Sequence, residues 1–365
     1  MTGNGRTQVV VVGAGIAGLA CAAELRSAGV PVRLRERSRV PGGRLASRRL
    51  DGRPADLGAA YFTVDDPGFA DLVRRWQAAG LAREWTDTFV AYECGAGGEP
   101  AGGPRPVPGP MRWAAPAGLR SLAEQLAADL PVETGAPVER IEPGPLVDGE
   151  PARAVVLAMP GPQAARLLDP RLTAAVAAAG GQRWSPVLAV VLRYADRDWA
   201  DFDGAFVNGH PVLGGIWDDG ARRGDGAAVL VAHTTADFAG RHLAEPAAAG
   251  PAVEAAVRDL LRLPRPARDR YVHRWSYAHP TSAPGPTGPA GSAGSAGSAG
   301  SAGSAGSAGS AGSAGSAGSA GSAGGGRLFH LDDAGVALAG DAFGRPRVQT
   351  AWRSGRELGR ALAAA

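Results

Sequence analysis

The sequence predicts an α/β fold, and three stretches near its start carry that prediction. The apolar run QVVVVGAG has the length and β-branched composition of a buried strand that ends in a turn. The next stretch, AGLACAAELRSAG, is typical of a helix that ends at Gly29, and VPVRLRER is typical of a second strand. Together they predict a strand–helix–strand unit, in which a helical crossover joins parallel strands.

The rest of the chain continues this pattern and adds a second sheet. Leucines recur along one face of a predicted helix from Leu119 to Leu130. The segments VLAVVLRY and AAVLVAHTT are expected to be strands of another sheet. The other expected elements are strands at PVETGAPVERI, ARAVVLAMP and GVALAGD, and helices at VEAAVRDLLRL and TAWRSGRELGRALAAA.

Composition restricts the classes of function. The formal net charge is +3, and every basic residue is an arginine, spread along the chain between acidic residues. We expect no nucleic-acid partner, because such partners need a clustered basic surface. No apolar run in the sequence reaches the roughly 18 residues of a membrane span, so we expect a cytoplasmic protein without a membrane partner. Two distant cysteines and six histidines without ligand spacing predict neither a disulfide nor a metal site.

A repetitive tract interrupts the second half of the chain. From residue 285 to 326, glycine recurs at every third position, mostly in Gly-Ser-Ala repeats, and proline ends at Pro289. A collagen helix needs continued proline or hydroxyproline, and a strand needs a two-residue alternation. We therefore expect residues 285–326 to be a flexible insertion in a surface loop and not a domain.

A glycine-rich turn follows the first predicted strand. Gly13 permits the tight turn, Gly15 lets the backbone approach a pyrophosphate, and Gly18 lets the helix pack against the strand. Ile16 and Ala17 begin the helix, whose free N–H groups attract phosphate. A carboxylate about 20 residues on binds an adenosine ribose. Glu36 supplies that acid at the end of the second strand, so the unit predicts a dinucleotide site, for either NAD or FAD.

A second glycine turn favours FAD. Arg37 follows Glu36, and the sequence then reads Pro-Gly-Gly-Arg, ending in Gly43 and Arg44. Such a turn brings a guanidinium fork, which binds phosphate in bidentate fashion, to the same pyrophosphate. The simple NAD fingerprint has no such element, so we expect Arg37 and Arg44 to contact the FAD pyrophosphate. The other arginines nearby are expected to face solvent: Arg33, Arg35, Arg39, Arg48 and Arg49.

Several segments also share the order and content of one protein family. They are VVVVGAGIAGLACAAEL, ERSRVPGGRLASRR, ADLGAAYFTVDDPGF, PAGLRSLAEQLA, AVVLAMPGPQAARLL, HRWSYAHP and ALAGDAF with VQTAWRSGRELG. On these segments the chain resembles renalase-like flavoproteins of the flavin amine oxidase superfamily. DLGAAYFT and RWSYAHP are the more specific segments, although Ala60 stands where relatives have glutamine.

The resemblance implies a two-domain fold like that of p-hydroxybenzoate hydroxylase. A Rossmann-type FAD-binding domain of the two-dinucleotide-binding kind is expected at residues 1–65, 112–165 and 327–365. An antiparallel-sheet substrate domain is expected at residues 66–111 and 166–284.

The resemblance also implies further cofactor contacts. Asp341 would bind the flavin ribityl chain, and the helix that starts near Gln349 would point its positive end at the flavin N1–C2=O edge. A reduced flavin is negatively charged at that edge, so a helix N-terminus stabilises it. The other cofactor residues implied are Gly58, Ala59, Gly340, Val348 and Thr350.

The reaction that the resemblance implies is a hydride transfer. Bacterial renalases oxidise the 2- and 6-dihydro isomers of NAD(P)H: a hydride moves to flavin N5, NAD(P)⁺ leaves, and O2 is reduced to H2O2. Such a transfer depends on position more than on acid–base help. On the substrate side we expect Tyr61, His233, Trp275 and Tyr277, with His279 beside them, because aromatic rings stack on a nicotinamide or a flavin.

Two alternatives remain open. One is an oxidase of a small amine, with an aromatic cage for the substrate; the chain lacks the lysine that such enzymes commonly place near flavin N5. The other is a non-catalytic flavoprotein scaffold, which would bind FAD without being reduced at a useful rate.

Overall fold

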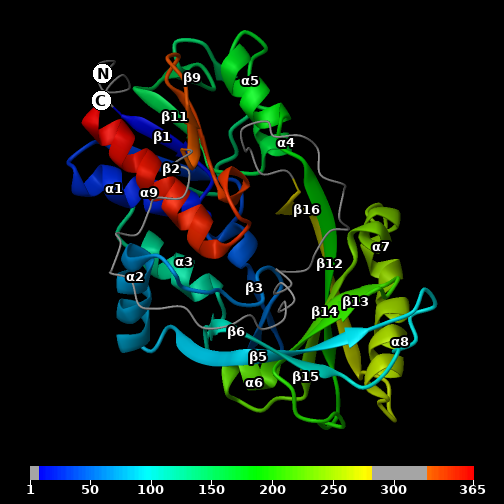
Figure 1. Ribbon diagram of the computed structural model, residues 1–365. Helices are drawn as coiled ribbons and strands as arrows, with labels where there is room; N and C mark the ends of the chain where they lie inside the picture. The colour runs from blue at the N-terminus through cyan, green and yellow to red at the C-terminus, as the bar shows by residue number, and fades with distance from the viewer. Residues whose placement is uncertain (1–7, 282–326) are drawn as a thin grey trace, which may run out of the picture.

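The computed structural model describes residues 8–281 and 327–365. The tract predicted to be a flexible insertion, at 285–326, lies almost wholly outside these ranges, and nothing in them tests that prediction. The described chain builds two large sheets that lie side by side, each with its own helices (Figure 1). The predicted α/β class is confirmed.

The first sheet has six strands in the order β17-β18-β11-β1-β2-β7. Neighbouring strands are parallel except for β17, which pairs with β18 in antiparallel fashion. The strands are β1 (Val9–Val12), β2 (Val32–Glu36), β7 (Val132–Thr134), β11 (Ala154–Leu157), β17 (Phe329–Leu331) and β18 (Val336–Ala339). Segments from both ends of the chain therefore share one Rossmann-type sheet.

Helices cover one face of this sheet. They are α1 (Ile16–Ser27), α2 (Pro67–Ala78), α3 (Arg120–Ala127) and α9 (Val348–Ala364). The axes of α1 and α9 approach closely, because a Cβ atom at Gly355 would lie 1.9 Å from the carbonyl oxygen of Ala17 (Figure 1). Side chains of α2, including Phe69 and Trp76, belong to the same core. The expected domain boundaries assign α2 to the substrate domain, whereas its side chains pack in the core of the first sheet. The local sequence pattern does not show this packing, because the partner helix α9 is distant along the chain.

The opposite face of the first sheet carries smaller elements. They are α4 (Gly161–Ala164), α5 (Thr173–Gly180) and a three-stranded sheet of β8 (Ile141–Glu142), β9 (Leu146–Val147) and β10 (Glu150–Pro151). Their apolar side chains pack with those of β1, β11 and β18. The expectation of one strand over PVETGAPVERI is wrong: the strand ends at Thr134, since Gly135 has a φ of +66°, which does not continue a strand.

The second sheet has seven strands in the order β16-β12-β15-β14-β13-β5-β6. They are β5 (Arg83–Glu93), β6 (Arg105–Ala114), β12 (Trp184–Arg193), β13 (Gly204–Asn208), β14 (Leu213–Asp218), β15 (Val229–Thr234) and β16 (Asp269–Pro280). All neighbours are antiparallel except β5 and β13. This confirms the expected antiparallel sheet, with one parallel pair that the sequence did not predict.

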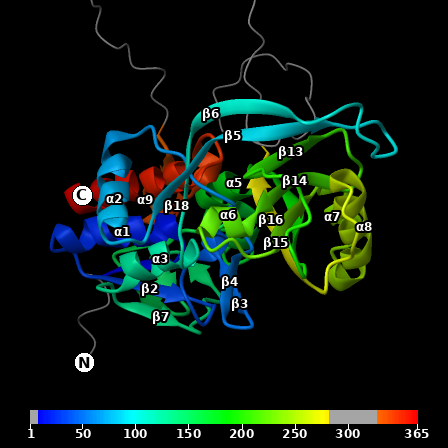
Figure 2. The same cartoon turned by 90° about the horizontal axis from the view of Figure 1, so that it is seen from below.

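The two faces of the second sheet have different partners. One face is covered by α7 (Ala236–Arg241) and α8 (Gly250–Leu261), which share an apolar core with it. The other face turns toward the first sheet, and there Val191, Val229 and Val231 pack against Ala55 and Leu57. This second face therefore lies on the side of the molecule that carries the first sheet (Figure 2).

A hairpin and several short helices complete the fold. The hairpin consists of β3 (Ser47–Leu50) and β4 (Arg53–Asp56), and α6 (Asp219–Arg223) follows β14. The 3-10 helices are Gly43–Leu45, Pro246–Ala249 and Asp341–Phe343. Within residues 8–281 and 327–365, no helix combines the length and the apolar character that crossing a bilayer requires.

Candidate functional site

The three positions of the first turn require glycine for different physical reasons. Gly13 has a φ of +105°, and a Cβ there would lie 2.8 Å from the carbonyl oxygen of Ala158. A Cβ at Gly18 would lie 2.0 Å from the oxygen of Gly13. Gly15 has an ordinary φ of −77°, and no atom lies within 4 Å of the place where its Cβ would be. Neither strain nor packing explains this glycine, so its open space suits the close approach of a ligand.

The first turn of α1 is built to face that open space. Gly15 is the N-cap of the helix and makes no side-chain cap hydrogen bond, and Ile16 and Ala17 form the first helical residues. The uncapped N–H groups of such a helix attract a phosphate. These features fit the pyrophosphate of a dinucleotide.

Glu36 lies where the sequence predicts a ribose-binding acid. Its carboxylate is buried at the end of β2 and accepts hydrogen bonds from the backbone N–H groups of Ala14 and Ser38, each at 2.8 Å. The neighbouring Arg37 is exposed and makes no ion pair within the described residues. The structure therefore fixes the orientation of Glu36 but not of Arg37.

The second glycine turn lies directly on the first. Gly42 donates its N–H to the carbonyl of Ala14 at 2.9 Å, and a Cβ at Gly43 would lie 3.4 Å from the Cα of Gly15. The carbonyl oxygen of Arg44 accepts the N–H of Ala59 at 2.9 Å, and a Cβ at Gly58 would lie 1.9 Å from that oxygen. Gly58 and Ala59 thus support the turn that carries Arg44.

Arg44 and Asp341, predicted from opposite ends of the chain, meet in the structure. The Arg44 guanidinium donates to both carboxylate oxygens of Asp341, at 2.9 and 2.5 Å, although the residues are 297 positions apart. It also donates to the carbonyl of Ala278 at 3.1 Å and lies 4.9 Å from the ring centroid of Trp184. Both groups are expected to contact FAD, and this pairing holds them at one place beside the two glycine turns.

The start of α9 adds a further contact to this region. Gly340 donates its N–H to Ser354 Oγ at 2.8 Å. Gln349 is buried, and its Oε1 accepts the N–H groups of Asp65 and Asp66, at 2.8 and 3.0 Å. The side chain of this predicted cofactor residue is therefore used by the protein itself. Val348 and Thr350 are half-buried in the first turn of α9.

On the substrate side, Tyr61 lies in an aromatic cluster beside a buried cation. Its ring meets Phe89 edge-on at a centroid distance of 5.3 Å. The Arg112 guanidinium lies 4.0 Å from the Phe89 ring centroid and 5.6 Å from that of Tyr61. Burial raises the pKa of Tyr61, and the positive charge of Arg112 opposes that rise.

His233 lies close to this cluster, against an indole that the sequence analysis missed. The centroids of the His233 and Trp217 rings are 4.6 Å apart, and Trp217 packs in the same apolar cluster as Tyr61. Burial, helped by the charges of His279 and Arg222, lowers the pKa of His233 to about 3, so the imidazole is neutral near pH 7. Nε2 of His233 and Nε1 of Trp217 are buried, and neither has a hydrogen-bond partner within the described residues. Such orphaned polar atoms are typical of a place completed by a ligand or water.

The other substrate-side candidates are held by protein atoms. Trp275 donates its Nε1–H to the carbonyl of Leu57 at 2.6 Å, and the Tyr277 hydroxyl accepts from Arg166 at 2.9 Å. His279 is close enough to Arg44 and Asp341 for their charges to affect its pKa, which burial lowers. The structure therefore gathers Tyr61 and His233 around one apolar cluster, while Trp275 and Tyr277 are bonded to other parts of the protein.

A buried charge cluster beneath the site was also missed. Asp219 accepts from Arg53, Arg222 and Arg223, and Arg222 donates to the carbonyl of Ala60 at 2.9 Å. The cluster therefore supports the segment that carries Tyr61. The spacing DDGARR predicts ion pairs within a helix, but it does not predict that Asp219, Arg222 and Arg223 are buried.

Two family models match the chain. One, described as an NAD(P)-binding Rossmann-like domain, matches residues 11–76. The other, described as flavin containing amine oxidoreductase, matches residues 107–361, more than half of the chain. Among curated proteins, hydroxyneurosporene desaturase of Rubrivivax gelatinosus is 46% identical over 57 residues, which make up 16% of this chain and 11% of the desaturase.

Solved structures share the whole fold at low identity. Cyclohexylamine oxidase from Brevibacterium oxydans IH-35A is similar with a TM-score of 0.68 and 14% identity over 98% of this chain and 99% of that one. A triple mutant of putrescine oxidase, made to redesign cofactor binding, is similar with a TM-score of 0.67 and 15% identity over 98% and 99%. At such identities the likeness concerns the fold, and one fold hosts many reactions. Because its family model spans most of the sequence, the chain belongs to the flavin containing amine oxidoreductase family, which confirms the predicted class of FAD-dependent oxidoreductase.

Proposed function

We propose that the protein is an FAD-dependent oxidase that takes a hydride from the 2- and 6-dihydro isomers of NAD(P)H. The products would be NAD(P)⁺ and, from O2, H2O2. One observation supports this choice over others within the family: Arg112 is buried beside Tyr61 and makes no ion pair with a carboxylate within the described residues. Its charge favours an anionic substrate.

More than one arginine lies near Tyr61. Arg112 is 5% exposed, and its guanidinium donates a hydrogen bond to the carbonyl of Asp87 at 2.6 Å. Arg345 and Arg347 are also near enough for their positive charges to lower the pKa of Tyr61, although Arg347 is paired with Asp65. A dinucleotide carries phosphates that gain from these charges, whereas a protonated amine is repelled by them.

The side chains suit recognition more than proton transfer. His233 stays neutral, so it offers one donor and one acceptor for a carboxamide, and Trp217 Nε1 offers another donor. Tyr61 presents an aromatic ring against which a nicotinamide can pack. FAD, held by the two glycine turns, Glu36, Arg44 and Asp341, would supply the two-electron acceptor when bound. Orientation of the donor carbon is then the main task of the protein.

An oxidase of a small amine is the second candidate, because aromatic rings line this place. Trp85, Phe89, Phe206 and Trp217 gather around Tyr61, and aromatic faces attract an alkylammonium group. Similar folds in putrescine oxidase and cyclohexylamine oxidase agree with this reading. The chain has no lysine, and Arg112 opposes a cation.

The deciding experiment uses the FAD-loaded full chain under anaerobic conditions. The protein is mixed with 2- and 6-dihydro-NAD(P), and in parallel with putrescine and cyclohexylamine, while the absorbance of the oxidised flavin is followed. We expect bleaching by the dihydro isomers alone, then recovery with H2O2 when air enters. Bleaching by the amines alone would replace the proposal with the second candidate. No bleaching in either arm would refute both and favour a non-catalytic flavoprotein.

A further inference from the structure

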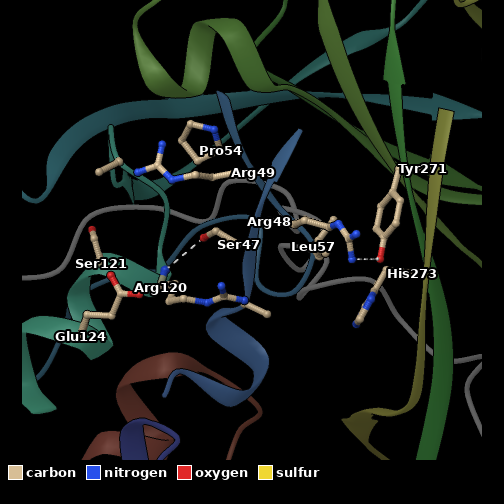
Figure 3. Close-up of a pocket in the computed structure, with 12 residues that line it drawn as sticks. Ser47, Arg48, Arg49, Pro54, Leu57, Arg120, Ser121, Glu124, Tyr271 and His273 are labelled. Carbon is tan, nitrogen blue, oxygen red and sulfur yellow. Dashed lines mark hydrogen bonds between the residues drawn. The ribbon is translucent and has the colours of Figure 1, made fainter. Parts of the chain in front are cut away.

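A cavity of about 410 Å³ lies between three elements, beside the second glycine turn, where a Cβ at Gly42 would lie 3.4 Å from Cγ of Arg120 (Figure 3). The β3–β4 hairpin, the first turns of α3 and the edge strand β16 form its walls. The polar side chains that line it include Arg48, Arg49, Arg120, Glu124, Tyr271 and His273. Neither the proposed FAD contacts nor the proposed substrate contacts use these residues.

The three arginines of this cavity have no carboxylate partner within the described residues. Arg48 donates to the Tyr271 hydroxyl at 3.0 Å and lies over its ring at 4.5 Å, and Arg49 donates to the carbonyl of Gly52 at 2.9 Å. Nε of Arg120 is buried without any partner. By contrast, Arg53 at the other side of the hairpin is paired with two aspartates.

The electrostatic environment of His273 agrees with an excess of positive charge. Burial lowers the pKa of His273, and the charges of Arg48, Arg120 and Arg274 lower it further. Glu124 is the acid that lines the cavity, and it makes no ion pair with the three arginines. The helix terminus itself is not the attraction, because Ser47 Oγ already accepts the N–H of Arg120 at 3.1 Å (Figure 3).

The size and walls of the cavity specify more than a simple ion. Leu57 and Pro54 add apolar surface, and a volume of about 410 Å³ exceeds that of a single phosphate and lies in the range of small-molecule sites. Guanidinium groups bind phosphate with paired hydrogen bonds. We propose that this cavity binds a small phosphorylated organic anion, at a site separate from that of FAD.

The cavity and the aromatic cluster around Tyr61 share no lining residue. One face of β16 carries Tyr271, His273 and Trp275, which are two positions apart. The Trp275 indole donates a hydrogen bond to the carbonyl of Leu57. The proposal therefore does not depend on the substrate of the oxidase.

Calorimetric titration of the FAD-loaded full chain tests the proposal at constant ionic strength. The probe is ribose 5-phosphate, with neutral ribose and citrate as parallel arms. We expect ribose 5-phosphate to bind and ribose not to bind. Arg48→Gln and Arg120→Gln should each weaken binding of the phosphate probe about 10-fold, the usual scale for one charge-assisted contact. Arg26→Gln, a change of an exposed arginine on α1, should leave it unchanged.

Further arms separate this site from the others. Arg112→Gln should not change binding of ribose 5-phosphate; a loss there would assign the probe to the substrate site and overturn the proposal. The proposal would also be overturned if ribose 5-phosphate did not bind, or if Arg48→Gln and Arg120→Gln bound it as tightly as the unchanged protein. Binding of citrate without binding of ribose 5-phosphate would overturn it as well. The flavin spectrum of each variant reports that it is folded and loaded. Flavin reduction by dihydronicotinamides is a separate readout, so the failure of one proposal is distinguishable from that of the other.

Discussion

Two buried arginines flank the segment Ala60–Tyr61, and the protein treats them differently. Arg222, on α6, is 1% exposed, donates to the carbonyl of Ala60 and is paired with Asp219. Arg112, on β6, is 5% exposed and lies over aromatic rings without a carboxylate partner in the described residues. A buried charge is expensive unless it is compensated. The first arginine is therefore compensated by the protein, whereas the second can be compensated by a ligand.

This difference separates support from recognition. The α6 cluster holds the backbone of the Tyr61 segment through neutralised charges, so its loss should affect folding. Arg112 relies on Phe89, on Tyr61 and on the carbonyl of Asp87. Its loss should affect binding of an anion more than folding.

Removing the central carboxylate of the cluster should have the largest consequence. Asp219→Asn removes the carboxylate that Arg53, Arg222 and Arg223 share, and it leaves Asp56 as the buried acid beside the last two. Breaking a buried ion pair costs about 3–5 kcal/mol. Urea unfolding of the FAD-loaded protein measures this loss. Asp71→Asn, in an exposed pair with Arg74, is the matched control, with an expected loss of at most about 1 kcal/mol. Equal losses in the two variants would remove the structural role given to the cluster.

The pH dependence of stability should report the burial of His233. Its pKa is about 3 in the folded protein, below the ordinary value of 6.5, so unfolding takes up a proton between these values. The folded state therefore loses stability as pH falls from 6.5, by about 2 kcal/mol at pH 5. His233→Gln should flatten this part of the profile in urea unfolding between pH 7 and pH 5. Superimposable profiles would contradict a buried, neutral imidazole.

Replacing Arg112, the arginine without a carboxylate partner among the described residues, should have the smallest effect on folding. It should specifically weaken the binding of substrate. Arg112→Gln is expected to raise the concentration of dihydronicotinamide for half-maximal anaerobic flavin reduction about 10-fold, near 1.4 kcal/mol. Arg105→Gln, an exposed change on the same strand β6, provides the control. If both variants behave alike, or if Arg112→Gln unfolds as readily as Asp219→Asn, the comparison fails.

Local patterns predicted the first strand–helix–strand unit and its glycine turn. The first glycine turn and Glu36 lie within one strand–helix–strand unit, where spacing along the chain translates directly into spacing in space. The parallel order of β1 and β2 follows from that unit. The positions of Gly13 and Gly18 are explained by contacts within it, and Gly15 by the space that it leaves.

The sequence by itself determined the class of fold and the second sheet, because the periodicity of strands and helices is local, and the resemblance of its motifs identified the flavin amine oxidase superfamily. Tertiary structure alone decided which distant residues meet. It brought Arg44 to Asp341, used Gln349 to hold Asp65, and placed Trp217 against His233. It also decided which buried arginines have carboxylate partners. Such outcomes depend on how two sheets pack and on which charges that packing removes from water, and no window of the sequence contains both partners.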